Sequence, residues 1–303
     1  MKRRDFLKSA YKASALVGAG MVLGNFDSLL FSQNTDYDLV AVKGGEPDVM
    51  FDKAIEALGG MKKFVKKGQK VVVKPNIGWD TAPERAANTN PKLVGRIVEH
   101  CYNAGAREVY VVDHTCDEWQ RCYKNSGIEK AAKDAKAKVV PANSESYYQE
   151  VSIPQGKVLK NTKEHEVILS SDVFINVPVL KNHGGATLTI AMKNLMGNVW
   201  DRRYWHRNDL HQCIADFATY RKPTLNIVDA YLVMKTNGPR GVSTDDVVLM
   251  KSQLLSTDIV AVDSAAAKLF GLKPEDIRYL NIATEMKIGR KDIENLNIKR
   301  ITV

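Results

Sequence analysis

The chain has 303 residues, of which 44% are hydrophobic and 26% are charged, as is typical of a globular protein. Its formal net charge is +9, and residues 1–33 contribute +3 of this because they hold five basic and two acidic side chains. The basic residues of the remainder are scattered, without a basic stripe and interleaved aromatic residues, so the composition argues against nucleic acid and favours an anionic small molecule as partner.

The first segment of the chain, residues 1–33, resembles a twin-arginine export signal. Arg3 and Arg4 precede an apolar run from Ala13 to Gly24, and such a signal is an address that the export machinery recognises. The run is shorter than the roughly 20 residues that a membrane-spanning helix needs. We therefore expect the twin-arginine export machinery as a partner, and a protein that is exported, periplasmic or anchored to the periplasmic side of the inner membrane. A basic amphipathic helix is the alternative for this segment.

Residues 34–303 are predicted to form a single α/β domain in which short strands alternate with helices. Runs rich in Val and Ile predict strands at 38–44, 69–76, 108–114, 138–142, 172–180, 225–230 and 298–303. Helical periodicity predicts helices at 47–65, 90–106, 127–137, 188–197, 210–220, 258–271 and 275–286. The almost continuous apolar strands are typical of a mainly parallel sheet that helices cover on both faces. Residues 150–170 alternate differently and predict a small antiparallel excursion.

Polar side chains follow four of the predicted strands at their carboxyl ends. The residues concerned are Lys74, Asn76, Asp113, His114, Lys181, Asn182, His183 and Asp229. Ligands of open α/β sheets bind beyond the carboxyl ends of the strands, so we expect these side chains to line one shared site. Asp and Asn also cap the helices that follow strands, which is the structural alternative for each of them taken alone.

A pair of glycines, Gly184 and Gly185, stands beside this predicted site. Glycines can bring backbone N–H groups close to a ligand, and a helix beginning near Ala186 would point its positive end in the same direction. Thr189 and Lys193 would then lie one turn apart on one face of that helix. The stretch therefore predicts an anion site, unless the glycines only make a turn and the lysines extend to water.

The predicted site residues fall into three groups, namely catalytic residues, cofactor-binding residues and the candidate metal ligands Asp113 and Asp229. The expected catalytic residues are Lys181, His183 and Lys193. The expected cofactor-binding residues are Lys74, Asn76, Gly184, Gly185, Thr189 and Asn194. In an enzyme the lysines would stabilise negative charge and His183 would transfer protons, while Asp113 or Asp229 would orient the histidine or bind a metal ion.

The four cysteines do not form a recognisable cluster-binding motif. Cys101 and Cys213 lie in apolar helical patterns, where we expect buried free thiols. Cys116 and Cys122 are six residues apart, which matches neither a zinc-binding pair nor the run that binds an iron–sulfur cluster. The identity of any cofactor is therefore unknown, and no cysteine-ligated iron–sulfur cluster is expected.

Five ordered segments of the chain resemble the prokaryotic domain of unknown function 362 family. They are "AIEALGGMKKFVKKGQKVVVKPN" (54–76), "DVFINVPVLKNH" (172–183), "TIAMKNLMGN" (189–198), "IVDAYLVMKTNGP" (227–239) and "DIVAVDSAAAKLFGL" (258–272). The shared motif positions implied by the resemblance are Lys74, Pro75, Asn76, Lys181, His183, Lys193, Asn194, Gly197 and Asp229. Some members carry a ferredoxin-like segment with clustered cysteines, which this sequence lacks.

Two functions fit these observations. The first is an exported protein whose lysine- and histidine-lined pocket binds an anionic substrate or cofactor, as an enzyme would. The alternative is a non-catalytic protein that binds or matures a cofactor for a redox partner.

Overall fold

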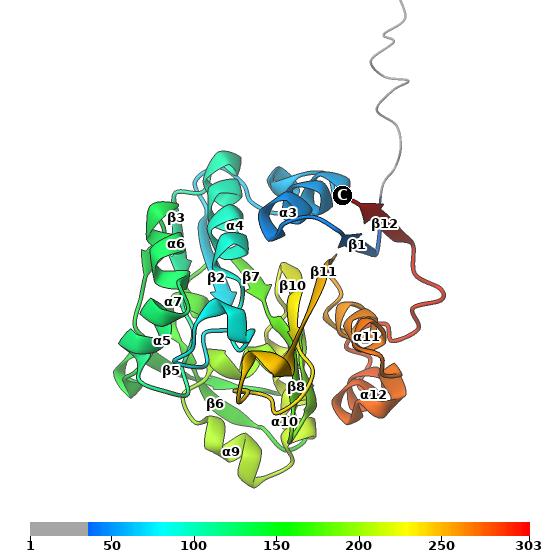
Figure 1. Cartoon of the computed structure of the whole chain (residues 1–303). Coiled ribbons are helices and arrows are strands. Elements are labelled where there is room, and N and C mark those ends of the chain that lie inside the picture. Colours follow the sequence, from blue (N-terminus) through cyan, green and yellow to red (C-terminus); the bar gives the residue numbers. More distant parts are fainter. Residues whose placement is uncertain (1–35) are drawn as a thin grey trace, which may run out of the picture. The chain divides into compact units, whose positions relative to one another are not determined.

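The Val- and Ile-rich runs of the sequence form a ten-stranded sheet in the computed structural model, which describes residues 36–303 (Figure 1). Its strands are β1 (Leu39–Lys43), β2 (Lys70–Pro75), β3 (Glu108–Val111), β4 (Lys138–Val139), β7 (Val173–Val177), β8 (Val179–His183), β9 (Thr187–Thr189), β10 (Leu225–Met234), β11 (Val247–Ser256) and β12 (Ile298–Thr302). Their main order is β12–β1–β11–β10–β7–β2–β3–β4, and β8 pairs with β10 and β9. The predicted export segment, residues 1–33, lies outside the described residues.

Most neighbouring strands of the sheet are parallel, which confirms the predicted α/β class. The parallel pairs are β12–β1, β10–β7, β10–β8, β7–β2, β2–β3 and β3–β4. The predicted antiparallel excursion is also present, as a separate pair of strands, β5 (Tyr148–Ser152) and β6 (Asn161–His165).

One central strand, β11, was not predicted. It runs antiparallel to both β1 and β10 and joins them into one sheet. Its first half is largely exposed and only its second half is buried. Its apolar residues fall in two short runs, 247–250 and 254–255, and the polar residues 251–253 separate them.

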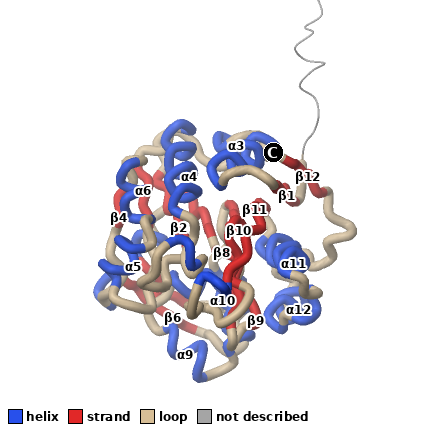
Figure 2. The backbone as a smooth tube through the Cα atoms, viewed as in Figure 1, coloured by secondary structure: helices blue, strands red, loops and turns tan. Residues whose placement is uncertain are grey.

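Helices cover both faces of the sheet (Figure 2). On one face, α3 (Pro47–Ala57), α4 (Pro91–Ala104), α5 (Trp119–Asn125) and α6 (Ile128–Asp134) share a core with Val71 and Val73 of β2. The core of the other face includes Val72 and residues of α7 (Glu166–Leu169), α8 (Ala191–Asn194), α9 (Arg202–Arg207), α10 (Leu210–Tyr220), α11 (Ile259–Phe270) and α12 (Arg278–Glu285). This alternation follows from the two-residue period of a strand. Within residues 36–303, no helix combines the length and the apolar character needed to cross a membrane.

The local sequence explains where the long helix α4 begins and ends. The Asn90 side chain accepts a hydrogen bond from the Lys92 amide, and Pro91 occupies the first helical position. Gly105 ends the helix at φ 104°, a left-handed conformation that glycine adopts without strain. These signals place α4 over β2, whose carboxyl end carries the first residues of the candidate site.

The predicted helix at 188–197 is wrong in its first part. Residues 179–189 instead form a hairpin of β8 and β9, in which Lys181 pairs with Thr189 and His183 with Thr187. Gly184 and Gly185 lie in its turn, Thr187 has a left-handed backbone with φ 66°, and the β-branched Thr189 favours the extended backbone that follows. Helix α8 begins only at Ala191 and continues as a 3-10 turn, Leu195–Asn198. Thr189 and Lys193 therefore belong to different elements.

Candidate functional site

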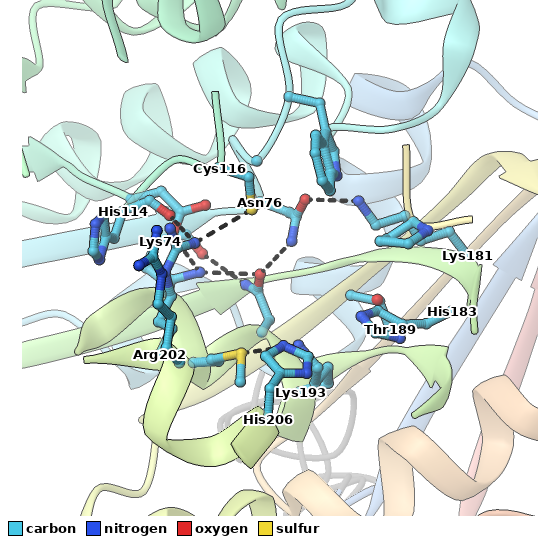
Figure 3. Close-up of a pocket in the computed structure, with 18 residues that line it drawn as sticks. Lys74, Asn76, His114, Cys116, Lys181, His183, Thr189, Lys193, Arg202 and His206 are labelled. Carbon is cyan, nitrogen blue, oxygen red and sulfur yellow. Dashed lines mark hydrogen bonds and ion pairs between the residues drawn. The ribbon is translucent and has the colours of Figure 1, made fainter. Parts of the chain in front are cut away.

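A pocket of about 450 Å³ lies at the carboxyl ends of β2 and β3, against the β8–β9 hairpin, α8 and α9 (Figure 3). Its charged lining residues are Lys74, Asp113, Lys181, Lys193, Arg202 and Arg203. Its histidines are His114, His183 and His206, and its lining also includes Asn76, Thr189 and Asn194. The structure thus brings the predicted lysines together with His183, Thr189 and both predicted asparagines around one cavity.

Lys74 and Asp113 form a buried ion pair in the wall of the pocket. The Lys74 Nζ lies 2.8 Å from Asp113 Oδ1, and the other carboxylate oxygen accepts a hydrogen bond of 2.6 Å from the Ile77 amide. A Cβ atom on Gly197 would lie 1.9 Å from Asp113 Oδ1 and 2.6 Å from Lys74 Nζ. Gly197 therefore has to be glycine for this ion pair to form.

Three asparagines connect the pocket lysines to the centre of the sheet. Asn194 Oδ1 accepts hydrogen bonds from Lys74 Nζ at 3.0 Å and from Asn76 Nδ2 at 2.9 Å, and its amide donates to Asn176 Oδ1. Asn76 Oδ1 in turn accepts from Lys181 Nζ at 3.0 Å. Because these amide oxygens are already occupied, Asn76 and Asn194 position the lysines.

Lys181 and Lys193 are buried without a carboxylate at ion-pair distance in the described part of the chain. Lys181 Nζ donates to Asn76 Oδ1 and to the Ala87 carbonyl. The hydrogen-bond partner of Lys193 Nζ is the Met196 thioether, at 3.0 Å. Burial lowers the pKa of Lys181 to about 7 and that of Lys193 to about 8; the neighbouring cations add to this effect, and Cys116 and Asp113 oppose it.

His183 is held as a neutral hydrogen-bond donor. Its Nδ1 accepts hydrogen bonds from the amides of Gly185 at 3.0 Å and Ala186 at 3.1 Å, so its proton is assigned to Nε2. Burial and the two nearby lysines lower its pKa to about 3. The Nδ1 lone pair is occupied by these two amides, so Nε2–H is the group that His183 can offer in this structure. Its proton-transfer role stays a prediction.

The two predicted glycines do not line the pocket. Gly184 and Gly185 form the hairpin turn, and the Gly185 amide donates to His183. The predicted helix N-terminus is also occupied, because the amides of Ala191 and Met192 donate to the buried Asp263 carboxyl at 2.7 and 3.0 Å. The expectation that glycine and helix amides face a ligand is therefore wrong.

The structure also separates the two carboxylates predicted as metal ligands. Asp229 lies inside β10, which continues to Met234, and accepts hydrogen bonds from the amides of Asn90 at 2.7 Å and Tyr231 at 3.0 Å. Asp113 lines the pocket and Asp229 does not. Among residues 36–303, no three His, Cys, Asp or Glu side chains are arranged to hold a metal ion.

Several residues of the pocket were not predicted. Arg202, Arg203 and His206 come from α9, and Arg202 Nη1 donates to the His114 carbonyl at 2.8 Å and lies 3.4 Å from Cys116 Sγ. The run of basic residues at 202–207 was the available sequence signal. Cys116 is exposed and lines the pocket, whereas Cys101 and Cys213 are buried thiols as predicted.

His114 presents the opposite tautomer to His183. Its Nδ1 lies 2.9 Å from the Val199 carbonyl, which requires a proton on Nδ1, and its ring stacks on Trp200 with a centroid distance of 5.1 Å. Burial, with Arg202 nearby, lowers its pKa to about 4. Both histidines are therefore neutral. At Nε2, His183 presents an N–H donor and His114 presents a lone pair that can accept a hydrogen bond.

Comparison with known proteins places these features in a family. A thylakoid-associated protein from Synechocystis is 27% identical over 243 residues, which are 78% of this chain and 73% of that protein. The lactate racemase apoprotein from Thermoanaerobacterium thermosaccharolyticum superposes with a TM-score of 0.49 at 11% identity, over 76% of this chain, and the match spans 56% of that protein's length. The family model described as a domain of unknown function, DUF362, matches residues 71–268, which is more than half of the chain. The chain therefore belongs to the DUF362 family.

Proposed function

We propose that this protein binds a small anionic ligand in the basic pocket, and that Lys181 and Lys193 balance the ligand's negative charge. The supporting observation is the charge of the lining, which has five basic side chains and one carboxylate, Asp113. That carboxylate is already paired with Lys74. An ammonium group removed from water is costly without a counter-charge, and a bound anion would provide one.

The remaining lining agrees with an anionic ligand of modest size. The cavity of about 450 Å³ is in the range of small-molecule sites. His183 contributes a hydrogen-bond donor, and Arg203 is exposed on the lining without an ion pair in the described part of the chain. Arginine suits carboxylate and phosphate groups because its donors form a planar fork.

We also propose that the protein is exported through the signal predicted in residues 1–33. The relative from Synechocystis is thylakoid-associated, which supports a location at or across a membrane. Twin-arginine export moves folded proteins, so an anionic ligand could bind before or after export.

A thermal-shift experiment tests the anion site. The melting temperature is measured with phosphate, sulfate, oxalate or pyruvate, against chloride at the same ionic strength. Saturation at 100 times Kd would add about 2.7 kcal/mol to stability, or roughly 5 °C for a domain of this size. Lys193→Met should abolish the rise, and Lys130→Met, at an 81% exposed position, should retain it. Absence of a rise with all four anions would contradict the proposal.

A further inference from the structure

Lys193 differs from the other pocket lysines in what its amine contacts. Lys74 is paired with Asp113, and Lys181 donates to two oxygen acceptors. Lys193 is 8% exposed, and among the described residues its Nζ has one hydrogen-bond partner, the Met196 thioether. A thioether sulfur is a weak acceptor. Cys116 and Asp113 favour the charged form of the amine, but no carboxylate of the described residues lies at ion-pair distance from it.

This environment is the one in which a lysine acts as a nucleophile. A neutral amine can attack a carbonyl carbon and an ammonium group cannot, and burial beside other cations favours the neutral amine. Burial, helped by the cations Arg202 and Lys74 and opposed by Cys116 and Asp113, lowers the pKa of Lys193 to about 8, so a minor fraction of the amine is neutral near pH 7. The amine also lines a cavity large enough for a small reactant.

We infer that Lys193 forms an imine with a small 2-oxo acid bound in the basic pocket. The inference rests on the proposed anion site and names its ligand class. A 2-oxo acid carries two adjacent groups that fit this pocket. Its carboxylate would balance the charge of the cationic lining, and its carbonyl carbon would react with the Lys193 amine. It is also small enough for the cavity.

The step balances without an added oxidant or reductant. The Lys193 Nζ forms a bond to the carbonyl carbon, the C=O π bond breaks, and a proton passes from the nitrogen to the oxygen, which gives a carbinolamine. Loss of water then forms the C=N bond. His183 is the hydrogen-bond donor that the lining offers to the carbonyl oxygen, because its proton is held on Nε2. The exposed Arg203 guanidinium is available to the carboxylate.

Reductive trapping tests the inference. The full chain is incubated with pyruvate and sodium cyanoborohydride, and its peptides are mapped by mass spectrometry. Hydride transfer to the imine carbon should leave an N-(1-carboxyethyl) group on Lys193. Lactate, which has no carbonyl, should leave no label. Acetone, which has no carboxylate, should label Lys193 far less than pyruvate does.

Lys193→Arg separates the nucleophile from the charge. This variant keeps a cation but has no amine that can form the imine under these conditions, so it should lose the label and retain the anion-dependent rise in melting temperature. Lys130→Arg, at an exposed position, should retain both.

The possible results separate the two proposals. Anion-dependent stabilisation of the wild type without label on Lys193 would overturn the imine and leave the anion site intact. Absence of both would overturn the proposed function as well. Label on Lys181, or equal label on Lys193 and the exposed Lys130, would overturn the assignment of the nucleophile.

Discussion

Lys193→Met replaces a buried amine by an apolar side chain of similar length, and we expect it to raise the stability of the ligand-free protein. The amine has a thioether as its partner in the described pocket, so its charged form is kept from water with little compensation. Methionine fills the same space without a charge to desolvate. Substituting a residue that serves ligand binding at the expense of stability is expected to stabilise the protein and abolish binding.

The magnitude follows from the lowered pKa of Lys193. Its pKa falls from an ordinary value of 10.5 to about 8, and at about 1.4 kcal/mol per pH unit this difference corresponds to about 3 kcal/mol. Between these two values the unfolded chain binds the proton and the folded protein does not, so wild-type stability rises with pH there. The advantage of the variant should therefore be about 3 kcal/mol at pH 7 and should disappear near pH 10.5.

The assay is urea unfolding of both proteins at several pH values between 7 and 10. The other charged groups that act on or face Lys193 are Lys74, Asp113, Cys116, Lys181, His183, Arg202 and His206. These groups are present in both proteins. Lys193 lowers the pKa of Lys181, His183 and His206, so the difference between the two unfolding curves reports Lys193 together with its effect on these neighbours. Equal or lower stability of the variant at pH 7, or a difference that does not change with pH, would refute the reasoning.

Three further predictions concern the pocket wall, its pH response and export. Gly197→Ala should cost about 3–5 kcal/mol in urea unfolding by breaking a buried ion pair, whereas Gly184→Ala, with no atom within 4 Å of the added carbon, should change stability little. Anion affinity measured by calorimetry should be constant from pH 5 to 6.5 and fall as pH rises, because Lys181 and Lys193 lose protons at about 7 and 8. Constant affinity up to pH 9 would contradict this. Replacing both arginines of the predicted export signal by lysine should keep the protein in the cytoplasm in cell fractionation, and normal export would contradict the signal.

The sequence predicted the position of the site because that position depends on strand direction. Lys74 and Asp113 follow buried parallel strands, and parallel strands end at the same edge of a sheet. Lys181 lies in β8, the strand that follows β7 along the chain, and the apolar run at 172–180 predicted a strand that ends directly before it. Periodicity and composition are enough for such an inference.

The contacts around these residues could not be predicted in the same way. The amides beside Gly185 and at the start of α8 donate to His183 and Asp263, and Asp263 lies 72 residues from Ala191 in the chain. Which acceptor a backbone amide selects depends on tertiary packing. Asp229 was assigned to a strand end because its polar side chain interrupts the apolar run, but the apolar residues 230–234 continue β10 to Met234.

The pairing of β1 with β12 has a consequence for the order in which the chain is synthesised. β1 is the first strand described and β12 the last, and they are parallel neighbours from Leu39–Ile298 to Lys43–Thr302. During translation β1 therefore has an unpaired edge until residues 298–302 have left the ribosome, and an unpaired edge can pair with another chain. The segment just before β1 is the predicted export signal. If translocation began before synthesis ended, β1 would therefore enter the export machinery without its neighbour β12.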